Sequence, residues 1–206
     1  MYNDITGIVL AGGKSTRMGQ NKSFLKLGEF DAVEITINLM KSLFSEVIIS
    51  SNEPELYEKY GLNIVEDIFT HKGPLAGIHA GMIASRTEKN FVISCDVPLL
   101  SEEIIVHLIE INKEEDIAIY RADGFLQQLV GLYHKKLIPQ IEAILEENIE
   151  EVRAEKQHHR KCNVKRLVEE STSRIIDADS LDFYKEGTFF NMNHPEDYEK
   201  ILKSMT

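Results

Sequence analysis

The sequence has few cysteines, no long apolar run and no basic leader. Its two cysteines, Cys95 and Cys162, are far apart and have no paired spacing. A disulfide framework is therefore not expected, and a reducing compartment fits. No apolar run reaches the roughly 18 residues of a membrane span. The amino terminus, MYNDITGIVL, lacks the basic segment of a secretory signal peptide. We therefore expect a cytoplasmic protein without a membrane span.

Basic residues are also scarce relative to acidic ones. The chain has 23 Lys and Arg against 34 Asp and Glu, a net charge of −11. This balance argues against a general nucleic-acid or membrane-surface binder, which needs a basic face. The length of 206 residues suits one α/β domain over residues 1–206, and the sequence shows no internal repeat.

The most informative stretch is TGIVLAGGKSTRMGQNKSFL, residues 6–25. An apolar run leads into a tight turn, Ala11-Gly12-Gly13, and three cations follow it: Lys14, Arg17 and Lys22. Glycines let the backbone approach a ligand closely, and the free N–H groups of such a turn form an anion site. The cations would place positive charge where a phosphate chain lies.

This stretch matches neither the P-loop nor the GxGxxG fingerprint. The plain alternative is a strand-to-loop turn with solvated lysines. The string LAGGKSTRMGxxK is longer than a simple turn requires, which favours phosphate binding.

Strand-like and helix-like segments alternate along the chain, as in a mostly parallel sheet. This pattern predicts a three-layer αβα, Rossmann-like fold, in which ligands bind at the carboxyl ends of the strands. Strands are expected at 7–10, 46–50, 62–65, 91–94, 117–120, 129–133 and 173–176. Helices are expected at 31–44, from Pro74, at 102–112, at 137–145 and after Pro195.

Asp96 follows the apolar strand expected at 91–94. A carboxylate at that position is well placed to hold Mg²⁺, which commonly takes one or two protein carboxylates and fills its shell with water and phosphates. The alternative is a turn or cap residue in Asp-x-Pro. The glycine loop upstream favours the metal role, and Cys95 is expected to be a small buried neighbour.

The segment 148–170 is highly charged, and a solvated helical face is its plain interpretation. The sharper one is a basic flap that faces an anionic second substrate. His158, His159 and Cys162 lack a second ligand pair at zinc spacing, so no zinc site is expected. Farther on, Asn191 and Asn193 alternate and could face one side of an extended segment, or else serve as caps.

Four segments together resemble the molybdenum cofactor guanylyltransferase family of nucleotidyltransferases. They are LAGGKSTRMGQNKSFL, VEDIFTHKGPLAGIHAGM, VISCDVPLL and FFNMNHPEDYEKIL. The first is shared with many nucleotidyltransferases of the glycosyltransferase-A-like, nucleotide-diphospho-sugar transferase fold, and the others are more specific. The resemblance implies Mg²⁺-dependent transfer of GMP from GTP to the phosphate of molybdopterin, with release of pyrophosphate. It also implies handoff to other enzymes of cofactor biosynthesis or to acceptor enzymes.

The resemblance also implies roles for particular residues. Asp96 would contact GTP and hold Mg²⁺, and Arg17 and Lys22 would stabilise the leaving pyrophosphate. Asn191 and Asn193 would seat the pterin substrate. The nucleotide contacts implied are Leu10, Ala11, Gly12, Gly13, Lys22, Asn52, Asp67 and Asp96.

The sequence departs from the family pattern in places. Asn21 stands where an acidic residue usually precedes the lysine, Gln128 stands where proline usually follows a glutamine, and the region near Asn148 lacks an expected glycine. Two other functions therefore stay open: a related cytidylyltransferase or sugar-phosphate nucleotidyltransferase, and a non-catalytic nucleotide-binding protein of cofactor assembly.

Overall fold

The centre of the molecule is a seven-stranded sheet. The computed structural model describes residues 1–12, 21–154 and 163–204, with backbone only for 148–154 and 163. The strand order is β5-β4-β1-β6-β8-β7-β9, and β8 runs antiparallel to both of its neighbours while the other pairings are parallel. The strands are β1 (Tyr2–Leu10), β4 (Phe44–Ser50), β5 (Asn63–Val65), β6 (Lys89–Ser94), β7 (Ile117–Ala122), β8 (Phe125–His134) and β9 (Ser173–Asp177). The expected mostly parallel α/β sheet is confirmed.

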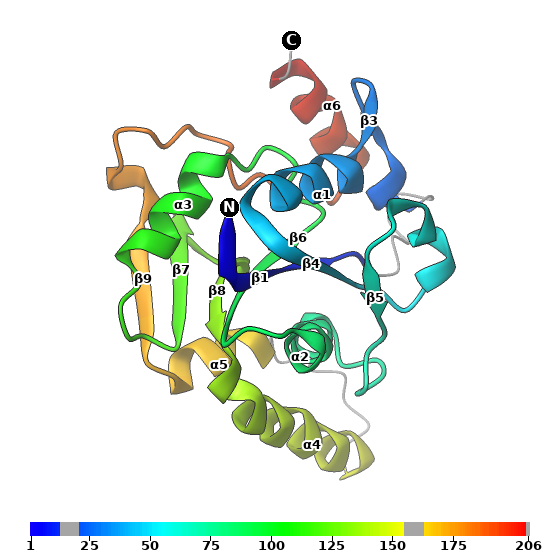
Figure 1. Cartoon of the computed structure of the whole chain (residues 1–206), viewed down its shortest axis with the longest axis vertical. Helices are drawn as coiled ribbons and strands as arrows, with labels where there is room; N and C mark the ends of the chain where they lie inside the picture. Colours follow the sequence, from blue (N-terminus) through cyan, green and yellow to red (C-terminus); the bar gives the residue numbers. More distant parts are fainter. Residues whose placement is uncertain (13–20, 155–162, 205–206) are drawn as a thin grey trace.

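Helices cover both faces of this sheet (Figure 1). One face carries α1 (Ala32–Leu43) and α3 (Glu102–Ile111). The opposite face carries α2 (Pro74–Ala84), α4 (Ile138–Ala154) and α5 (Asn163–Glu170). Each layer has its own buried apolar cluster, one with α1 and α3 side chains and the other with side chains of α2, α4 and α5. The three-layer arrangement expected from the sequence is therefore confirmed.

A small third cluster lies beside the start of α1. The two-stranded ribbon β2 (Lys26–Leu27) and β3 (Phe30–Asp31) packs with α6 (Pro195–Ser204) around the buried side chains of Leu27, Met192 and Ile201. This cluster brings the carboxyl-terminal segment back to the residues that follow the glycine loop. Five short 3₁₀ helices complete the described elements: η1 (Lys22–Phe24), η2 (Pro54–Leu56), η3 (Glu58–Tyr60), η4 (Lys135–Leu137) and η5 (Ala178–Ser180).

Local sequence accounts for several boundaries. Pro74 opens α2, where a missing N–H costs nothing. Ser101 caps α3, because its hydroxyl oxygen accepts from the backbone N–H of Ile104 at 3.5 Å. Asp123 and Gly124 connect β7 to β8 with φ of 52° and 79°, the left-handed pair that a two-residue hairpin turn requires. The helix after 31 forms in spite of its β-branched residues, since its apolar face is buried against the sheet.

Helix α2 lies very close to the sheet because of two glycines. A Cβ on Gly81 would come within 2.6 Å of Ile8 Cγ2, and one on Gly77 within 2.8 Å of Ser50 Oγ. The small residues Gly77 and Gly81 therefore allow close helix–sheet packing.

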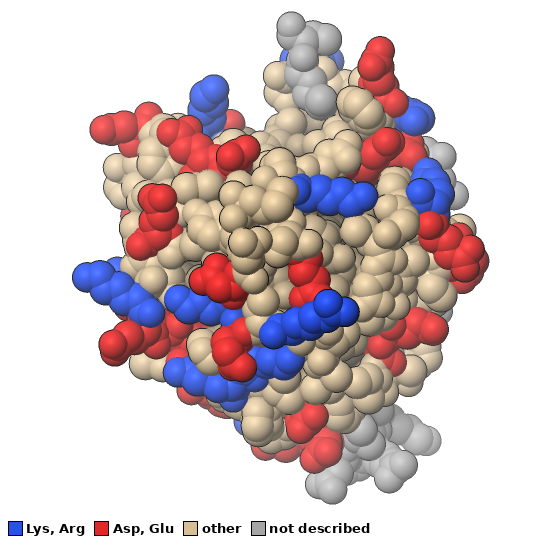
Figure 2. All heavy atoms as spheres, viewed as in Figure 1, with Lys and Arg blue, Asp and Glu red and all other residues tan. Residues whose placement is uncertain are grey.

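The surface mixes charges of both signs. On the face shown in Figure 2, Lys and Arg side chains are interspersed with Asp and Glu, and the described residues form no broad basic band there. None of the described helices combines the length and apolar character needed to cross a membrane.

Candidate active site

The candidate site is built where four parallel strands end. Leu10 is in register with Ser50 of β4 and Ser94 of β6, and Ser50 is in register with Val65 of β5. The pairing continues past the strands, since Ala11 N–H donates to the Ser50 carbonyl at 2.9 Å. The polar residues that follow these strands therefore lie along one edge of the sheet.

Asn52 and Asp67 form a clamp between the ends of β4 and β5. The Asn52 amide nitrogen donates to Asp67 Oδ2 at 2.8 Å, and the Asp67 backbone N–H donates to Asn52 Oδ1 at 3.0 Å. Burial raises the pKa of the Asp67 carboxyl, while the Asn52 hydrogen bond and the nearby His71 oppose that rise. The structure thus brings together two residues that the resemblance had implied for one nucleotide site.

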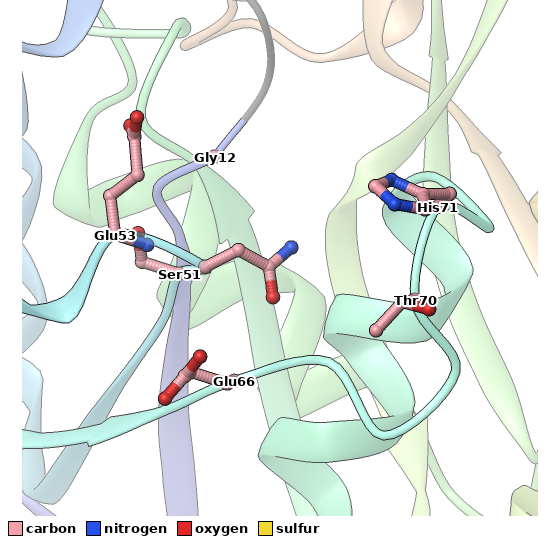
Figure 3. A pocket seen from close by; sticks show the side chains of 7 residues that line it. Gly12, Ser51, Glu53, Glu66, Thr70 and His71 are labelled. Carbon is pink, nitrogen blue, oxygen red and sulfur yellow. Dashed lines mark hydrogen bonds between the residues drawn. The ribbon is translucent and has the colours of Figure 1, made fainter.

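A pocket of about 400 Å³ opens beside this clamp. Glu53, Ser51 and Glu66 lie along one side of it, Thr70 and His71 lie opposite, and Gly12 is at its margin (Figure 3). Asn52 completes the lining. Gly12 and Asn52 were expected here from the sequence.

Sequence reasoning missed Ser51, Glu53, Glu66, Thr70 and His71. Their position in the sequence could have indicated them, because all five residues lie in the segments that directly follow β4 and β5. His71 also has a φ of 63°, which is uncommon for a residue other than glycine and occurs often at functional sites.

The charge of this pocket suits one end of a nucleotide better than the other. Its described lining includes two carboxylates, Glu53 and Glu66, and no Lys or Arg. A triphosphate would be repelled there, whereas base N–H groups and ribose hydroxyls can donate to carboxylates. The pocket therefore fits a base or ribose.

Near the end of β6, Lys22 supplies the positive charge that the described pocket lining lacks, and it pairs with Asp96. Lys22 Nζ lies 2.5 Å from Asp96 Oδ2, and both side chains are mostly buried. Lys22 begins η1, which Asn21 caps by accepting the Ser23 N–H on its Oδ1 at 3.0 Å. Asn21 therefore supplies the side-chain oxygen that an acidic residue would supply at this position.

Asp96 has the features of a cation ligand. Asp96 is 8% exposed, and its Oδ1 atom is buried with no hydrogen-bond partner among the described residues. A buried carboxylate oxygen without a donor is costly unless a ligand satisfies it. The described part of the chain contains no cluster of three or more His, Cys, Asp or Glu side chains suited to a metal. The residues present therefore fit a cation held by one carboxylate, water and substrate oxygens.

Cys95 is a buried neighbour and not a ligand candidate. Its Sγ lies 3.3 Å from Ser23 Oγ, and burial raises the pKa of the thiol to about 11. The residue is buried, which confirms the expectation of a small buried neighbour of Asp96.

The carboxyl-terminal segment reaches this pair directly. Met192 N–H donates to the Asp96 carbonyl at 2.9 Å, and Lys22 Nζ donates to Asn193 Oδ1 at 3.2 Å. Asn191 instead donates to the carbonyl of Phe189 at 3.2 Å. The structure therefore places Asn193 in the Lys22–Asp96 site, while the side-chain bond of Asn191 lies within its own segment.

Several sequence predictions lie outside the described residues. Gly13, Lys14 and Arg17 are among them, as are His158, His159 and Cys162. Their roles stay predictions. Gln128, the other departure named above, lies in β8, and its carbonyl accepts from the Tyr133 hydroxyl.

Gly12 after a parallel strand, a pocket with two carboxylates and a Lys–Asp pair thus lie at the edge of the sheet where α/β enzymes bind ligands such as nucleotides. The model of the MobA-like NTP transferase domain matches residues 7–161. The probable molybdenum cofactor guanylyltransferase of Carboxydothermus hydrogenoformans is 33% identical, over 97% of this chain and 96% of that protein. The chain therefore belongs to the MobA-like NTP transferase family, with the molybdenum cofactor guanylyltransferases, and is a nucleotidyltransferase.

Solved structures agree on the fold. Molybdopterin-guanine dinucleotide biosynthesis protein A from Archaeoglobus fulgidus superposes with a TM-score of 0.78 at 19% identity, over 97% of this chain and 98% of that one. A manganese complex of a Mycobacterium tuberculosis protein superposes with a TM-score of 0.70 at 15% identity, over 98% of this chain and 100% of that one. At these identities the likeness establishes the shared fold.

Proposed function

We propose that this protein transfers GMP from GTP to the phosphate of molybdopterin. The products are the guanine dinucleotide form of the molybdenum cofactor and pyrophosphate. The family relation supports this reaction, and the single structural observation that carries it is the Lys22–Asp96 pair at the carboxyl edge of the sheet.

In this proposal the two ends of GTP occupy different parts of the site. The base and ribose enter the anionic pocket beside the Asn52–Asp67 clamp. The triphosphate lies toward Lys22, whose ammonium offsets phosphate charge. The glycine turn, of which Leu10, Ala11 and Gly12 are described, offers its backbone to the nucleotide, with Gly13 and Arg17 as predicted further contacts.

Mg²⁺ is the proposed cofactor, and Asp96 is the residue that would hold it. When bound there, it would neutralise charge on the phosphate oxygens. The buried, unpartnered Oδ1 of Asp96 supports this assignment.

The chemistry asks mainly for positioning and charge neutralisation. A phosphate oxygen of molybdopterin forms a bond to the α-phosphorus of GTP, the bond from that phosphorus to the α–β bridging oxygen breaks, and the electron pair leaves with pyrophosphate. The attacking oxygen is already anionic, so no strong general base is needed. Lys22 can stabilise the leaving group from a pre-set position, which is an effective form of transition-state stabilisation.

The pocket also supports guanine over cytosine. Guanine presents N1–H and N2–H₂ donors on one edge, whereas cytosine presents a single donor group, N4–H₂. A carboxylate is an acceptor-only group and can take both guanine donors. Glu66 is the better-fixed candidate of the two pocket carboxylates, since hydrogen bonds from the Ser51 N–H to the Val65 carbonyl and from the Asp67 N–H to Asn52 hold the backbone on both sides of it.

The deciding experiment is a turnover assay with molybdopterin, Mg²⁺, and GTP or CTP labelled at the α-phosphate. We expect label to move from GTP into the pterin product, with little from CTP. Transfer from CTP alone would replace the proposed guanylyltransferase with a cytidylyltransferase. Binding of GTP without any transfer would favour a non-catalytic role.

The remaining proposals follow from the same reaction. We propose residues 1–206 as one catalytic domain in the cytoplasm, with other cofactor-biosynthesis enzymes or acceptor enzymes as partners for the handoff of molybdopterin and product. Co-purification of the product with such an enzyme would test the handoff.

A further inference from the structure

The Lys22 ammonium is shared by two distant parts of the chain. It donates to Asp96 Oδ2 at 2.5 Å and to Asn193 Oδ1 at 3.2 Å. Asp96 follows a central strand, whereas Asn193 belongs to the segment before α6. The same cation therefore contacts the proposed metal ligand and a residue that the family resemblance assigns to the pterin.

Asn193 is held in place on both sides. Its neighbour Met192 is fully buried in the third apolar cluster and donates its N–H to the Asp96 carbonyl at 2.9 Å. The backbone N–H of Asn193 donates to Asp197 Oδ2 at 3.0 Å, at the start of α6. The backbone that carries the Asn193 amide is therefore anchored beside Lys22.

Asp96 and Asn193 would respond differently to a cation. Asp96 holds Lys22 by charge, and a divalent cation at Asp96 would weaken that attraction. Asn193 is neutral, so its hydrogen bond to the ammonium survives the arrival of the cation. Lysine has a long, flexible stem, and the retained hydrogen bond to Asn193 limits the side-chain orientations that Lys22 must lose on binding phosphate.

We propose that Asn193 is a positioning residue for Lys22 and acts on the nucleotide half of the reaction, before the pterin binds. This inference rests on the proposed nucleotidyl transfer and adds a role in GTP binding to a residue implied only for the second substrate. The carboxyl-terminal segment then serves both substrates, through the same side chain.

The test measures the affinity for GTP with Mg²⁺, by titration calorimetry, in the absence of molybdopterin. We expect Asn193→Ala to weaken GTP binding about tenfold, as for loss of a hydrogen bond to a charged group. Asn38→Ala is the matched control, because Asn38 is exposed on α1 and lies outside the proposed site, and it should leave GTP affinity unchanged. Asn193 is exposed, so its substitution should leave thermal unfolding unchanged.

A double mutant separates positioning from a general structural role. In a Lys22→Ala background, Asn193→Ala should cause no further loss of GTP affinity, because its effect passes through Lys22. Wild-type GTP affinity in Asn193→Ala, or an equal further loss in the Lys22→Ala background, would overturn the inference. Neither result would affect the proposed function, which fails only if label is not transferred from GTP.

Discussion

Helices cover both halves of the sheet, yet the described residues of the candidate site follow the strands of one half. In the first half, β5, β4, β1 and β6 are all parallel, and their carboxyl ends meet at one edge. In the second half, β7 runs into the antiparallel β8 through a two-residue turn. Parallel neighbours need long crossovers, so their carboxyl ends are free to carry binding loops, whereas a hairpin uses that end for its turn.

This difference also appears in what the loops contain. The clamp, the pocket and Asp96 all follow strands of the first half. In the second half the hairpin turn contacts a packed ring, since the Tyr184 hydroxyl donates to Asp123 and Tyr184 stacks on Phe189. At the opposite end of β7 lies a surface ion pair, Arg174–Glu115. Substitutions in the first half should therefore change activity, and those in the second half should change stability.

The largest expected effect is at the Lys22–Asp96 pair. Asp96→Ala or Lys22→Ala should lower turnover by well over tenfold, on the order of 100-fold, because each removes a fixed charge at the phosphates. Both variants should stay folded by circular dichroism. Near-normal transfer of labelled GMP by either variant would remove the site assignment.

Substitution of one glycine in each half tests the difference between the two halves of the sheet. Gly131 is the glycine in the second half. A Cβ on Gly131 would lie 2.8 Å from the Ala118 carbonyl oxygen and 2.5 Å from Ile119 Cγ2. Because backbone cannot move aside easily, Gly131→Ala should lower the free energy of unfolding by about 2 kcal/mol. Urea titration measures the loss of stability. Calorimetry under conditions where the variant is folded should then give the wild-type affinity for GTP.

Gly77→Ala is its counterpart in the first half. The new Cβ would meet Ser50 Oγ at 2.8 Å and Leu10 Cδ2 at 3.2 Å, and both are ends of side chains that can shift. A gain of about 1 kcal/mol in helix propensity offsets much of that strain, so stability should change little. GTP affinity should fall several-fold, since Leu10 and Ser50 stand at the nucleotide edge. Unchanged affinity here, or lost affinity in Gly131→Ala, would break the comparison.

Base selection is a smaller effect within the first half. Glu66→Gln should reduce the preference for GTP over ITP, which lacks the N2 amine, by about threefold, because the charged acceptor is replaced by a neutral one. Competition binding measures the ratio. Glu55→Gln makes the same charge change on η2, outside the described pocket lining, and should keep the wild-type ratio. An unchanged ratio in Glu66→Gln would move base recognition to other groups.

The smallest effect concerns stability in the second half. A hydrogen bond from Arg174 lowers the pKa of Glu115 from 4.5 to about 2. The folded state therefore binds fewer protons, so this pair stabilises the fold above pH 4.5, and the stabilisation is lost as the pH falls toward 2. Glu115→Gln should lower the urea midpoint slightly at neutral pH, and the difference from wild type should shrink with acidification. GTP affinity should be the same in both proteins, and a difference that grows in acid would contradict this assignment.

The sequence by itself determined the elements and the chemical type of the site. The alternation of strand-like and helix-like segments located strands and helices, and the glycine loop with Lys22 and Asp96 indicated phosphate chemistry. These signals are local, because propensity, capping and turn geometry act over a few residues. The expected position of Asp96 at the end of a central strand needed only that local information.

Tertiary structure alone decided which of these residues meet. The Asn52–Asp67 clamp spans 15 residues, the Lys22–Asp96 pair spans 74, and the Lys22–Asn193 contact spans 171. Such contacts depend on strand register and on how α6 packs beside β2 and β3, and no local pattern encodes either. Glu66 and His71 were missed for the same reason, since a pocket wall exists only after separate strand ends come together.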